Sequence, residues 1–248
     1  MRNSPGARAG ERPAVIPAEG ASLQGSLAWP AHPAGLVLFA HGSGSSRLSP
    51  RNQYVAQRLR QAGLATLLFD LLTEAEAQDR TNVFDLPLLA RRLLCGAEWA
   101  DGQPEVGGLP TGLFGASTGG GAALIAAALA SASIAAVVSR GGRPDHAGRY
   151  LPLVQAPTLL IVGGDDSAVI RLNRQAFARL TCTRELAVIP GAGHLFEEPG
   201  TLESAADWAA GWFARYLVGK PAQPDSGVGR ADSTASGSRS ASVVMPRR

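Results

Sequence analysis

The 248-residue sequence has little cysteine and no long apolar run. Its two cysteines, Cys95 and Cys182, form neither a C-x-x-C pair nor a zinc-like spacing. This excludes a disulfide framework and fits a reducing cytoplasm. No stretch reaches 18 apolar residues, and the arginines near the N-terminus are not followed by the apolar segment of a signal peptide. We therefore expect a cytoplasmic protein without membrane contact.

The net charge of +3 is small and unevenly placed. Residues 1–12 sum to +2 and residues 220–248 to +3, so the body of the chain, 13–219, carries −2. A basic tail is not a basic surface, and we expect no specific nucleic-acid partner. With 45% hydrophobic and 17% charged residues, the composition is typical of one globular domain. We expect that domain at 13–219, with disordered segments at 1–12 and 220–248.

Strand-like and helix-like segments alternate along this domain. Apolar runs predict buried strands at 35–40, 65–69, 109–114, 135–139, 158–162 and 185–189. Helical spacing predicts helices at 50–62, 85–99, 122–130, 169–180 and 201–218, with a helical turn at 73–79. Two further strands, at 14–16 and 22–29, are expected to form a hairpin at a sheet edge. The alternation predicts an α/β fold, a three-layer α/β/α sandwich around a mostly parallel, twisted sheet.

The segment Gly115-Ala116-Ser117-Thr118-Gly119 lies between an expected strand and an expected helix, and it fits G-x-S-x-G. In this motif a serine stands on a sharp, strained turn, and the positions two before and two after it come too close for side chains. The hydroxyl then lies at a helix N-terminus, where partial positive charge favours a developing oxyanion. Ser117 is thus a candidate nucleophile. Because the motif also arises by chance in a chain with 30 glycines, a base and an acid must accompany it.

A base for Ser117 is found among the four histidines. In such sheets, ligands bind at the carboxyl ends of the strands. His194 follows the last expected strand and so lies at this edge. His41 also begins a loop at this edge, whereas His32 precedes a strand and His146 stands in a polar loop. His194 is therefore the candidate base.

An acid must orient the imidazole of His194, and two aspartates are suitably placed. Asp165 and Asp166 follow the strand before the one that leads to His194. The resulting order of serine, aspartate and histidine is the order found in α/β-hydrolases. One of the two aspartates can instead cap the helix that begins near Val169.

An oxyanion needs two N–H donors. We expect one from the Thr118 amide, directly after the nucleophile, and one from the Ser43 amide in the glycine-rich loop after residues 35–40. This loop can also be interpreted as a phosphate loop. However, Arg47 stands where G-x-G-x-x-G needs its third glycine, and no Lys-Ser/Thr pair follows, so neither nucleotide fingerprint is complete.

Four segments in this order resemble the α/β-hydrolase superfamily, and most of all its dienelactone-hydrolase-like branch. They are L-F-A-H-G-S-G around His41, L-F-G-A-S-T-G-G around Ser117, L-L-I-V-G-G-D-D-S-A-V ending at Val169, and I-P-G-A-G-H-L-F around His194. The resemblance spans residues 13–218. It implies the α/β-hydrolase fold and favours Asp166 as the acid, because relatives place this acid three residues before a valine. Dienelactone hydrolase itself resembles this chain in outline but uses a cysteine nucleophile, so the resemblance does not imply lactone substrates.

Several residues near the expected site are candidates for substrate binding: His41, Gly42, Arg47, Arg140 and Arg143. The arginines, together with Arg51, can bind a substrate carboxylate or phosphate. Alternatively, they pair with local acids such as Asp145 or face solvent. The segment 139–158 is too short for a large lid domain, so we expect a shallow, open pocket.

The sequence thus predicts a serine hydrolase without cofactor or metal, which cleaves an ester, thioester or related acyl bond of a small substrate. Ser117 attacks, His194 accepts and returns the proton, Asp166 holds the imidazole, and water releases the acyl-enzyme. Two alternatives remain: an acyltransferase that uses the same triad, and a non-catalytic protein of this fold that binds a ligand or partner. The substrate and the oligomeric state are not predicted.

Overall fold

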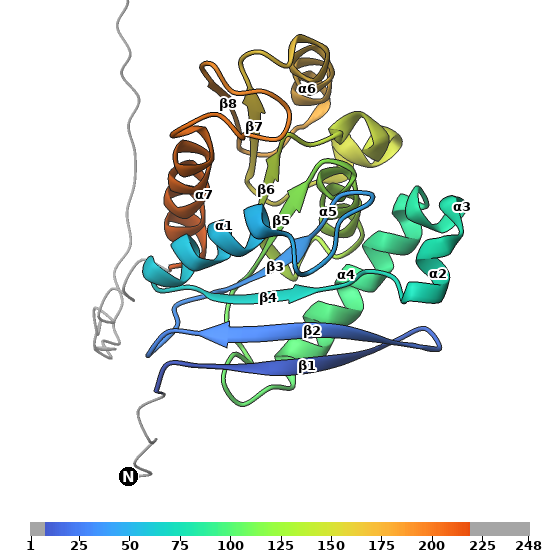
Figure 1. The fold of residues 1–248 in the computed structure, drawn as a ribbon, viewed down its shortest axis with the longest axis vertical. Coiled ribbons are helices and arrows are strands. Elements are labelled where there is room, and N and C mark those ends of the chain that lie inside the picture. The colour runs from blue at the N-terminus through green and yellow to red at the C-terminus, as the bar shows by residue number, and fades with distance from the viewer. Residues whose placement is uncertain (1–7, 219–248) are drawn as a thin grey trace, which may run out of the picture.

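A computed structural model describes residues 8–218 and shows three layers (Figure 1). The middle layer is an eight-stranded sheet with strand order β1-β2-β4-β3-β5-β6-β7-β8. The strands are β1 (Gly10–Ala18), β2 (Ala21–Trp29), β3 (Leu36–Ala40), β4 (Ala65–Phe69), β5 (Thr111–Ala116), β6 (Ile134–Arg140), β7 (Thr158–Gly163) and β8 (Arg184–Ile189). The β1–β2 and β2–β4 pairs are antiparallel and all other pairs are parallel. The expected three-layer fold and the edge hairpin are confirmed.

Helices cover both faces of the sheet. One face packs against α1 (Pro50–Gln61) and α7 (Thr201–Leu217). The opposite face packs against α4 (Leu86–Asp101), α5 (Thr118–Leu129), α6 (Ser167–Arg179) and the 3-10 segment η1 (Pro144–Leu153). Two short helices, α2 (Glu74–Gln78) and α3 (Arg80–Val83), follow β4. Two separate apolar cores result, one on each side of the sheet.

The central strands and α5 are deeply buried. Every residue of β3 and β4 is buried, as the continuous apolar runs predict for strands covered on both faces. Helix α5 is built almost wholly from Gly, Ala, Leu and Ile, and its first ten residues are buried. Small side chains let it lie close to the sheet. The turn from β5 into α5 is therefore held on all sides, and this turn carries Ser117.

Three parts of the structure differ from expectation. β1 begins at Gly10, so residues 10–12, expected in a disordered segment, belong to the first strand; Arg12 also pairs with Glu105 at 3.0 Å. Residues 1–7 and 220–248 of the two expected disordered segments lie outside the described residues. Helix α3 and η1 were not foreseen, because α3 spans only four residues and η1 is a 3-10 segment interrupted at Gly148, where φ is 44°.

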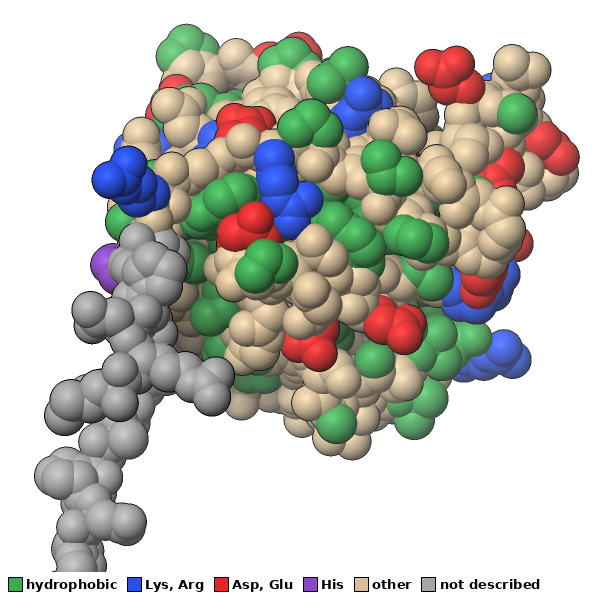
Figure 2. Space-filling model, turned by 90° about the horizontal axis from the view of Figure 1, so that it is seen from below, with side chains coloured by type: hydrophobic (Ala, Val, Ile, Leu, Met, Phe, Trp, Pro, Cys, Tyr) green, Lys and Arg blue, Asp and Glu red, His purple; other side chains and the backbone are tan. Residues whose placement is uncertain are grey.

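The connection from β6 to β7 contains only η1, and no large lid domain is seen within residues 8–218, as expected. In the same part of the chain, no helix combines the length and the apolar character that crossing a membrane requires. On the face shown in Figure 2, acidic and basic side chains are mixed with apolar ones.

Candidate active site

Ser117 stands on a strained turn between β5 and α5. Its backbone has φ 52° and ψ −123°, a region that side chains rarely adopt. The flanking glycines are required by space: a Cβ on Gly115 would lie 2.6 Å from the Cα of Gly120. A Cβ on Gly119 would overlap the carbonyl of Ala40 at the end of β3. The turn therefore has the geometry of a nucleophile elbow.

Asp166 binds His194 and also caps a helix. Its Oδ2 accepts a hydrogen bond from His194 Nδ1 at 2.7 Å, and its Oδ1 accepts one from the Val169 amide at 3.2 Å. Both interpretations of this aspartate from sequence thus hold at once, one for each oxygen. The neighbouring Asp165 is exposed, and the structure gives it only a backbone contact, from its amide to the Ala192 carbonyl. Asp166, not Asp165, is the carboxylate that orients the imidazole.

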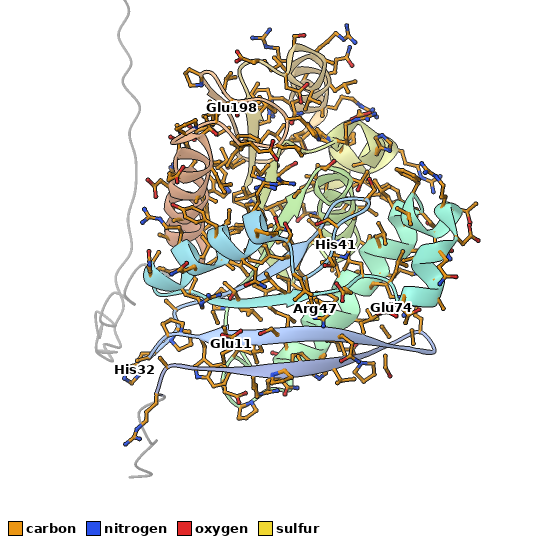
Figure 3. The ribbon with its side chains drawn as sticks, in the orientation of Figure 1. Glu11, His32, His41, Arg47, Glu74 and Glu198 are labelled. Carbon is orange, nitrogen blue, oxygen red and sulfur yellow. The ribbon has the colours of Figure 1, made fainter. Side chains whose placement is uncertain are left out.

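Glu198 is exposed, and it holds the loop that carries His194. Its Oε2 accepts a hydrogen bond from the Gly193 amide at 3.0 Å, and this bond lowers the pKa of Glu198 (Figure 3). Phe196, on the other side of His194, is buried and has a φ of 56°. The histidine thus projects from a loop anchored at both flanks, although its own ring is partly exposed.

The segment 140–143 brings Ser117 and His194 to the same place. The Ser117 amide donates to the Arg140 carbonyl at 3.3 Å, and the Arg143 amide donates to the Ser117 carbonyl at 3.0 Å. Gly141 lies against the histidine, since a Cβ there would be 3.0 Å from the His194 carbonyl oxygen. Among the described residues, no hydrogen bond yet joins the Ser117 hydroxyl to the imidazole. In unliganded enzymes such bonds are often long and tighten when substrate binds.

The two expected oxyanion donors are neighbours, but one is already engaged. The Ser43 amide donates to Thr118 Oγ1 at 2.8 Å. Thr118 is the first residue of α5, so its own amide has no acceptor within the helix. Ser43 can therefore serve an oxyanion only after the Thr118 hydroxyl has turned away.

His41 and Gly42 lie near Ser117 and make different contacts. The Leu71 amide donates to His41 Nε2 at 3.1 Å, so Nε2 carries no proton and Nδ1–H faces the Gly42 carbonyl. Burial lowers the pKa of His41, which keeps the ring neutral. His41 thus ties the loop after β3 to the loop after β4. Gly42 abuts Ser117: a Cβ there would lie 2.9 Å from Ser117 Cβ.

Three partly buried arginines near the site are paired with local acids rather than free for an anion. Arg47 pairs with Asp70 through its side chain and its amide. Arg143 makes two hydrogen bonds to Asp145, at 2.9 and 2.8 Å, as the alternative interpretation had it. Arg51 pairs with an exposed glutamate of the histidine loop.

Arg140 is buried, with 7% of its surface exposed, and lies over the rings of Phe114 and Phe196. Its Nη2 reaches Asn52 Oδ1 at 3.5 Å, while Nε and Nη1 have no hydrogen-bond partner among the described residues. Burial, and then the charge of Arg51, lower the pKa of Arg140 to about 10, so it remains a cation at neutral pH. Arg140 thus packs against Phe196 of the histidine loop, and it is too buried to serve as an exposed anion-binding group.

A cavity of about 770 Å³ opens beside the loop after β3. It is walled by residues 41–48, by the segment after β4 and by α2 and α3; Figure 3 places His41, Arg47 and Glu74 around it.

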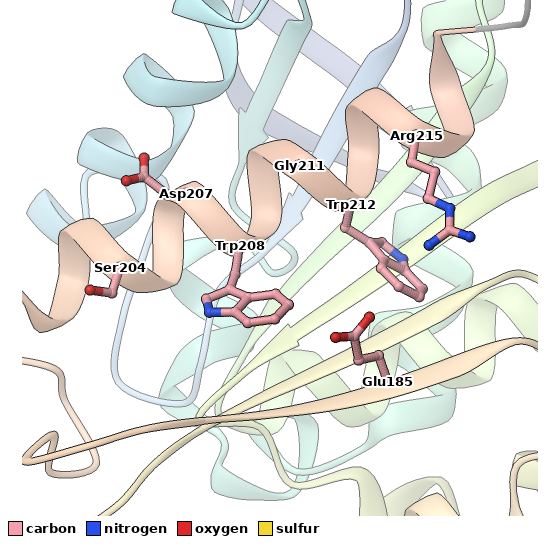
Figure 4. A pocket seen from close by; sticks show the side chains of 7 residues that line it. All are labelled: Glu185, Ser204, Asp207, Trp208, Gly211, Trp212 and Arg215. Atoms are coloured by element: carbon pink, nitrogen blue, oxygen red, sulfur yellow. The ribbon is translucent and has the colours of Figure 1, made fainter.

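A second hollow, of about 530 Å³, lies between α7 and β8 and contains Trp208, which is 43% exposed and not a core residue (Figure 4). It contains none of the candidate catalytic residues. Within residues 8–218, no cluster of three or more His, Cys, Asp or Glu is arranged to hold a metal.

Comparison with known proteins places this geometry in a family. No family model matches the chain. The crystal structure of a dienelactone hydrolase from Anabaena variabilis is 52% identical in sequence, with a TM-score of 0.82; the match covers 85% of this chain and all of that one. The chain belongs to the dienelactone-hydrolase-like α/β-hydrolases. Membership confirms the resemblance found in the sequence, and the solved relatives are hydrolases and esterases.

More distant structures share the fold of this family. Est1E from Butyrivibrio proteoclasticus is 17% identical, with a TM-score of 0.68, over 82% of this chain and 99% of its own. P91, a dienelactone-hydrolase-like promiscuous phosphotriesterase from metagenomic libraries, is 20% identical, with a TM-score of 0.69, over 85% of this chain and all of its own. At these identities the likeness concerns the fold alone.

Two Mycobacterium tuberculosis proteins, from strains CDC 1551 and H37Rv, are named provisionally as phosphoribosyl transferases. Each is 58% identical over 197 residues, which are 79% of this chain and 44% of each relative. The chain therefore spans less than half the length of these curated relatives.

Proposed function

We propose that this chain is a serine hydrolase that cleaves an ester, thioester or related acyl bond of a small substrate without a cofactor. The observation that carries the proposal is the 2.7 Å hydrogen bond between Asp166 and His194, beside a serine on a strained elbow. A fold that only bound a ligand would have no need of an oriented imidazole at this position. Membership of a hydrolase family supports the same reaction class.

In the proposed reaction, Ser117 Oγ attacks the substrate carbonyl carbon while its proton passes to His194 Nε2. Asp166 holds Nδ1–H and so stabilises the imidazolium that forms. The carbonyl oxygen becomes an oxyanion, which the Thr118 and Ser43 amides bind once the Thr118 hydroxyl has rotated. The tetrahedral intermediate expels the alcohol or thiol, which takes the proton from His194. Water then attacks the acyl-enzyme by the same route, and the carboxylic acid leaves.

Acyl transfer to an acceptor other than water would use the same residues. The two outcomes differ in product, so the acid and the new ester should be quantified with and without added alcohol or thiol. The name phosphoribosyl transferase belongs to relatives that this chain matches over only 44% of their length. No feature of the described site favours that activity for this chain.

The experiment that tests the proposal compares wild type with Ser117→Ala on a panel of short p-nitrophenyl esters and acyl thioesters. We expect wild type to turn over at least one of them and the variant to lose about 10⁴- to 10⁶-fold in kcat. A melting temperature within a few degrees of wild type would show that the variant is folded. If Ser117→Ala kept the full rate, the proposed nucleophile would be wrong.

A further inference from the structure

We propose that the cavity beside residues 41–48 is the acyl-binding site, and that it selects an uncharged, apolar acyl group over one with a terminal carboxylate. This inference rests on the proposed function. At about 770 Å³, the cavity is of the size that holds a small-molecule ligand.

The cavity adjoins Ser117 through Gly42. Gly42 lines it and packs against Ser117, since a Cβ on Gly42 would be 3.6 Å from Ser117 Oγ, whereas Ser117 itself is not a lining residue. Ser43, a proposed oxyanion donor, lines it as well. No residue of the His194 loop contributes to the lining. Because His194 must reach the leaving group, that group lies on the histidine side, and the acyl part of the substrate extends into the cavity.

The walls of the cavity offer apolar contacts. Five of its lining residues are large and apolar: Leu48, Leu72, Val83, Phe84 and Leu89. Two of them remain unusually exposed at the rim, Leu48 at 66% and Phe84 at 45%. An acyl chain that lay between these two side chains would remove apolar surface from water on both sides, which favours binding.

The charges that line the cavity cancel or are already paired. Arg47 is bound by Asp70, and His41 is neutral because its Nε2 accepts the Leu71 amide. Arg80 lies over the ring of Phe84, and Glu74 also lines the cavity, so the two arginines and the two acids of the lining sum to zero charge. A carboxylate on the acyl chain would have to compete with Asp70 for Arg47 or draw Arg80 away from the ring of Phe84, and it would share the cavity with the acids Asp70 and Glu74. The lining therefore disfavours an anionic acyl group.

The wall formed by α2 is fixed before substrate arrives. Arg92, which is only 3% exposed, donates to Glu76 Oε1 at 2.7 Å and to the Ala18 carbonyl. Glu76 in turn closes a capping box with Thr73 at the start of α2. One exposed residue of this helix, Ala77, lines the cavity, whereas Ala75 on the same helix does not. This pair provides a matched test.

The test measures kcat/KM for three esters: p-nitrophenyl acetate, p-nitrophenyl hexanoate and the mono-p-nitrophenyl ester of hexanedioic acid, which adds a terminal carboxylate. For wild type we expect hexanoate to exceed acetate, and to exceed the carboxylate ester, by at least about tenfold each. Ala77→Phe should lower the hexanoate value about tenfold and leave acetate within about twofold, because it fills the distal cavity. Ala75→Phe should change neither ratio. If Ala77→Phe does not fold, Val83→Trp narrows the same cavity and replaces it.

Each outcome bears on a different claim. If acetate is hydrolysed but the three esters react alike, or if the carboxylate ester is preferred, the assignment of the cavity is wrong while the serine hydrolase stands. If Ala75→Phe has the effect of Ala77→Phe, the cavity is also not the acyl site. If folded wild type hydrolyses none of the esters and Ser117 resists acylation, the proposed function fails, and the cavity assignment fails with it.

Discussion

Replacing Asp166 by Asn should abolish activity and leave the fold nearly unchanged, whereas replacing it by Ala should damage both. The reason is that its two oxygens have separate tasks. Oδ1 accepts the Val169 amide at 3.2 Å and caps α6, while Oδ2 accepts His194 Nδ1 at 2.7 Å. Asparagine can take over the cap, but it cannot offer the imidazolium a negative charge.

The expected sizes differ between the two tasks. Asn and Asp are about equally good N-caps, whereas Ala costs about 1 kcal/mol of helix stability. In a domain of this size, 1 kcal/mol lowers the melting temperature by about 2–4 °C. Loss of the orienting carboxylate costs about 10⁴-fold in kcat in comparable triads. Asp166→Asn should therefore lose about 10⁴-fold in kcat with a melting temperature close to wild type, and Asp166→Ala should lose that activity and a few degrees as well.

Two controls separate these effects. Asp165→Asn changes the exposed neighbour and should leave kcat within about threefold of wild type, as surface changes away from a site do. Asp85→Ala removes the cap of α4, where Asp85 accepts the Leu88 amide at 3.0 Å, and should lower the melting temperature without loss of kcat. Turnover of the best ester and thermal unfolding are measured for all four variants. An Asp166→Asn variant with kcat near wild type, or an equal loss in Asp165→Asn, would refute the assignment.

Three further predictions test other parts of the structure. Gly119→Ala should destabilise the fold by about 1–3 kcal/mol and abolish activity, because its Cβ would overlap the carbonyl of Ala40. The control Gly211→Ala adds a Cβ in α7 that meets no atom within 4 Å, and it should raise the free energy of unfolding by about 1 kcal/mol. Urea unfolding compares the two variants. Burial lowers the pKa of His41, so below about pH 6.5 this histidine takes up a proton more readily in the unfolded chain than in the folded chain. The free energy of unfolding should therefore fall as the pH drops from about 7.5 to about 5. In His41→Asn this fall should be smaller. Glu198→Ala frees the Gly193 amide and should lower kcat by up to about 100-fold with little change in melting temperature; unchanged kcat would show that the histidine loop needs no such anchor.

The layout of the fold could be predicted because its signals are local. Buried strands such as β3 and β4 appear in the sequence as uninterrupted apolar runs, and α1 begins at a proline, which suits the first turn of a helix. The elbow could be predicted because a Cβ at either of its two glycines would overlap backbone atoms. Only glycine fits at these two positions, so the motif has a fixed spacing in the sequence. His194 and the pair Asp165 and Asp166 followed from the rule that the carboxyl ends of parallel strands share one edge, and the resemblance to α/β-hydrolases favoured Asp166 of the two.

The contacts between distant loops could not be predicted in this way. Nothing in the sequence shows that the Ser43 amide reaches the Thr118 hydroxyl, 75 positions away. The pairing of Arg47 with Asp70 likewise depends on how two loops meet, so the sequence left open whether this arginine binds a substrate or pairs with a local acid. The α2 wall of the cavity was foreseen only as a helical turn, because the buried Arg92 that fixes it lies in another helix.

The most direct measurement is the intact mass of the folded protein after treatment with a fluorophosphonate, which reacts with activated serines. We expect one adduct on wild type, none on Ser117→Ala, and slow, incomplete labelling of Asp166→Asn. A folded wild type that gains no mass, or a Ser117→Ala variant that labels as wild type does, would show that Ser117 is not an activated nucleophile.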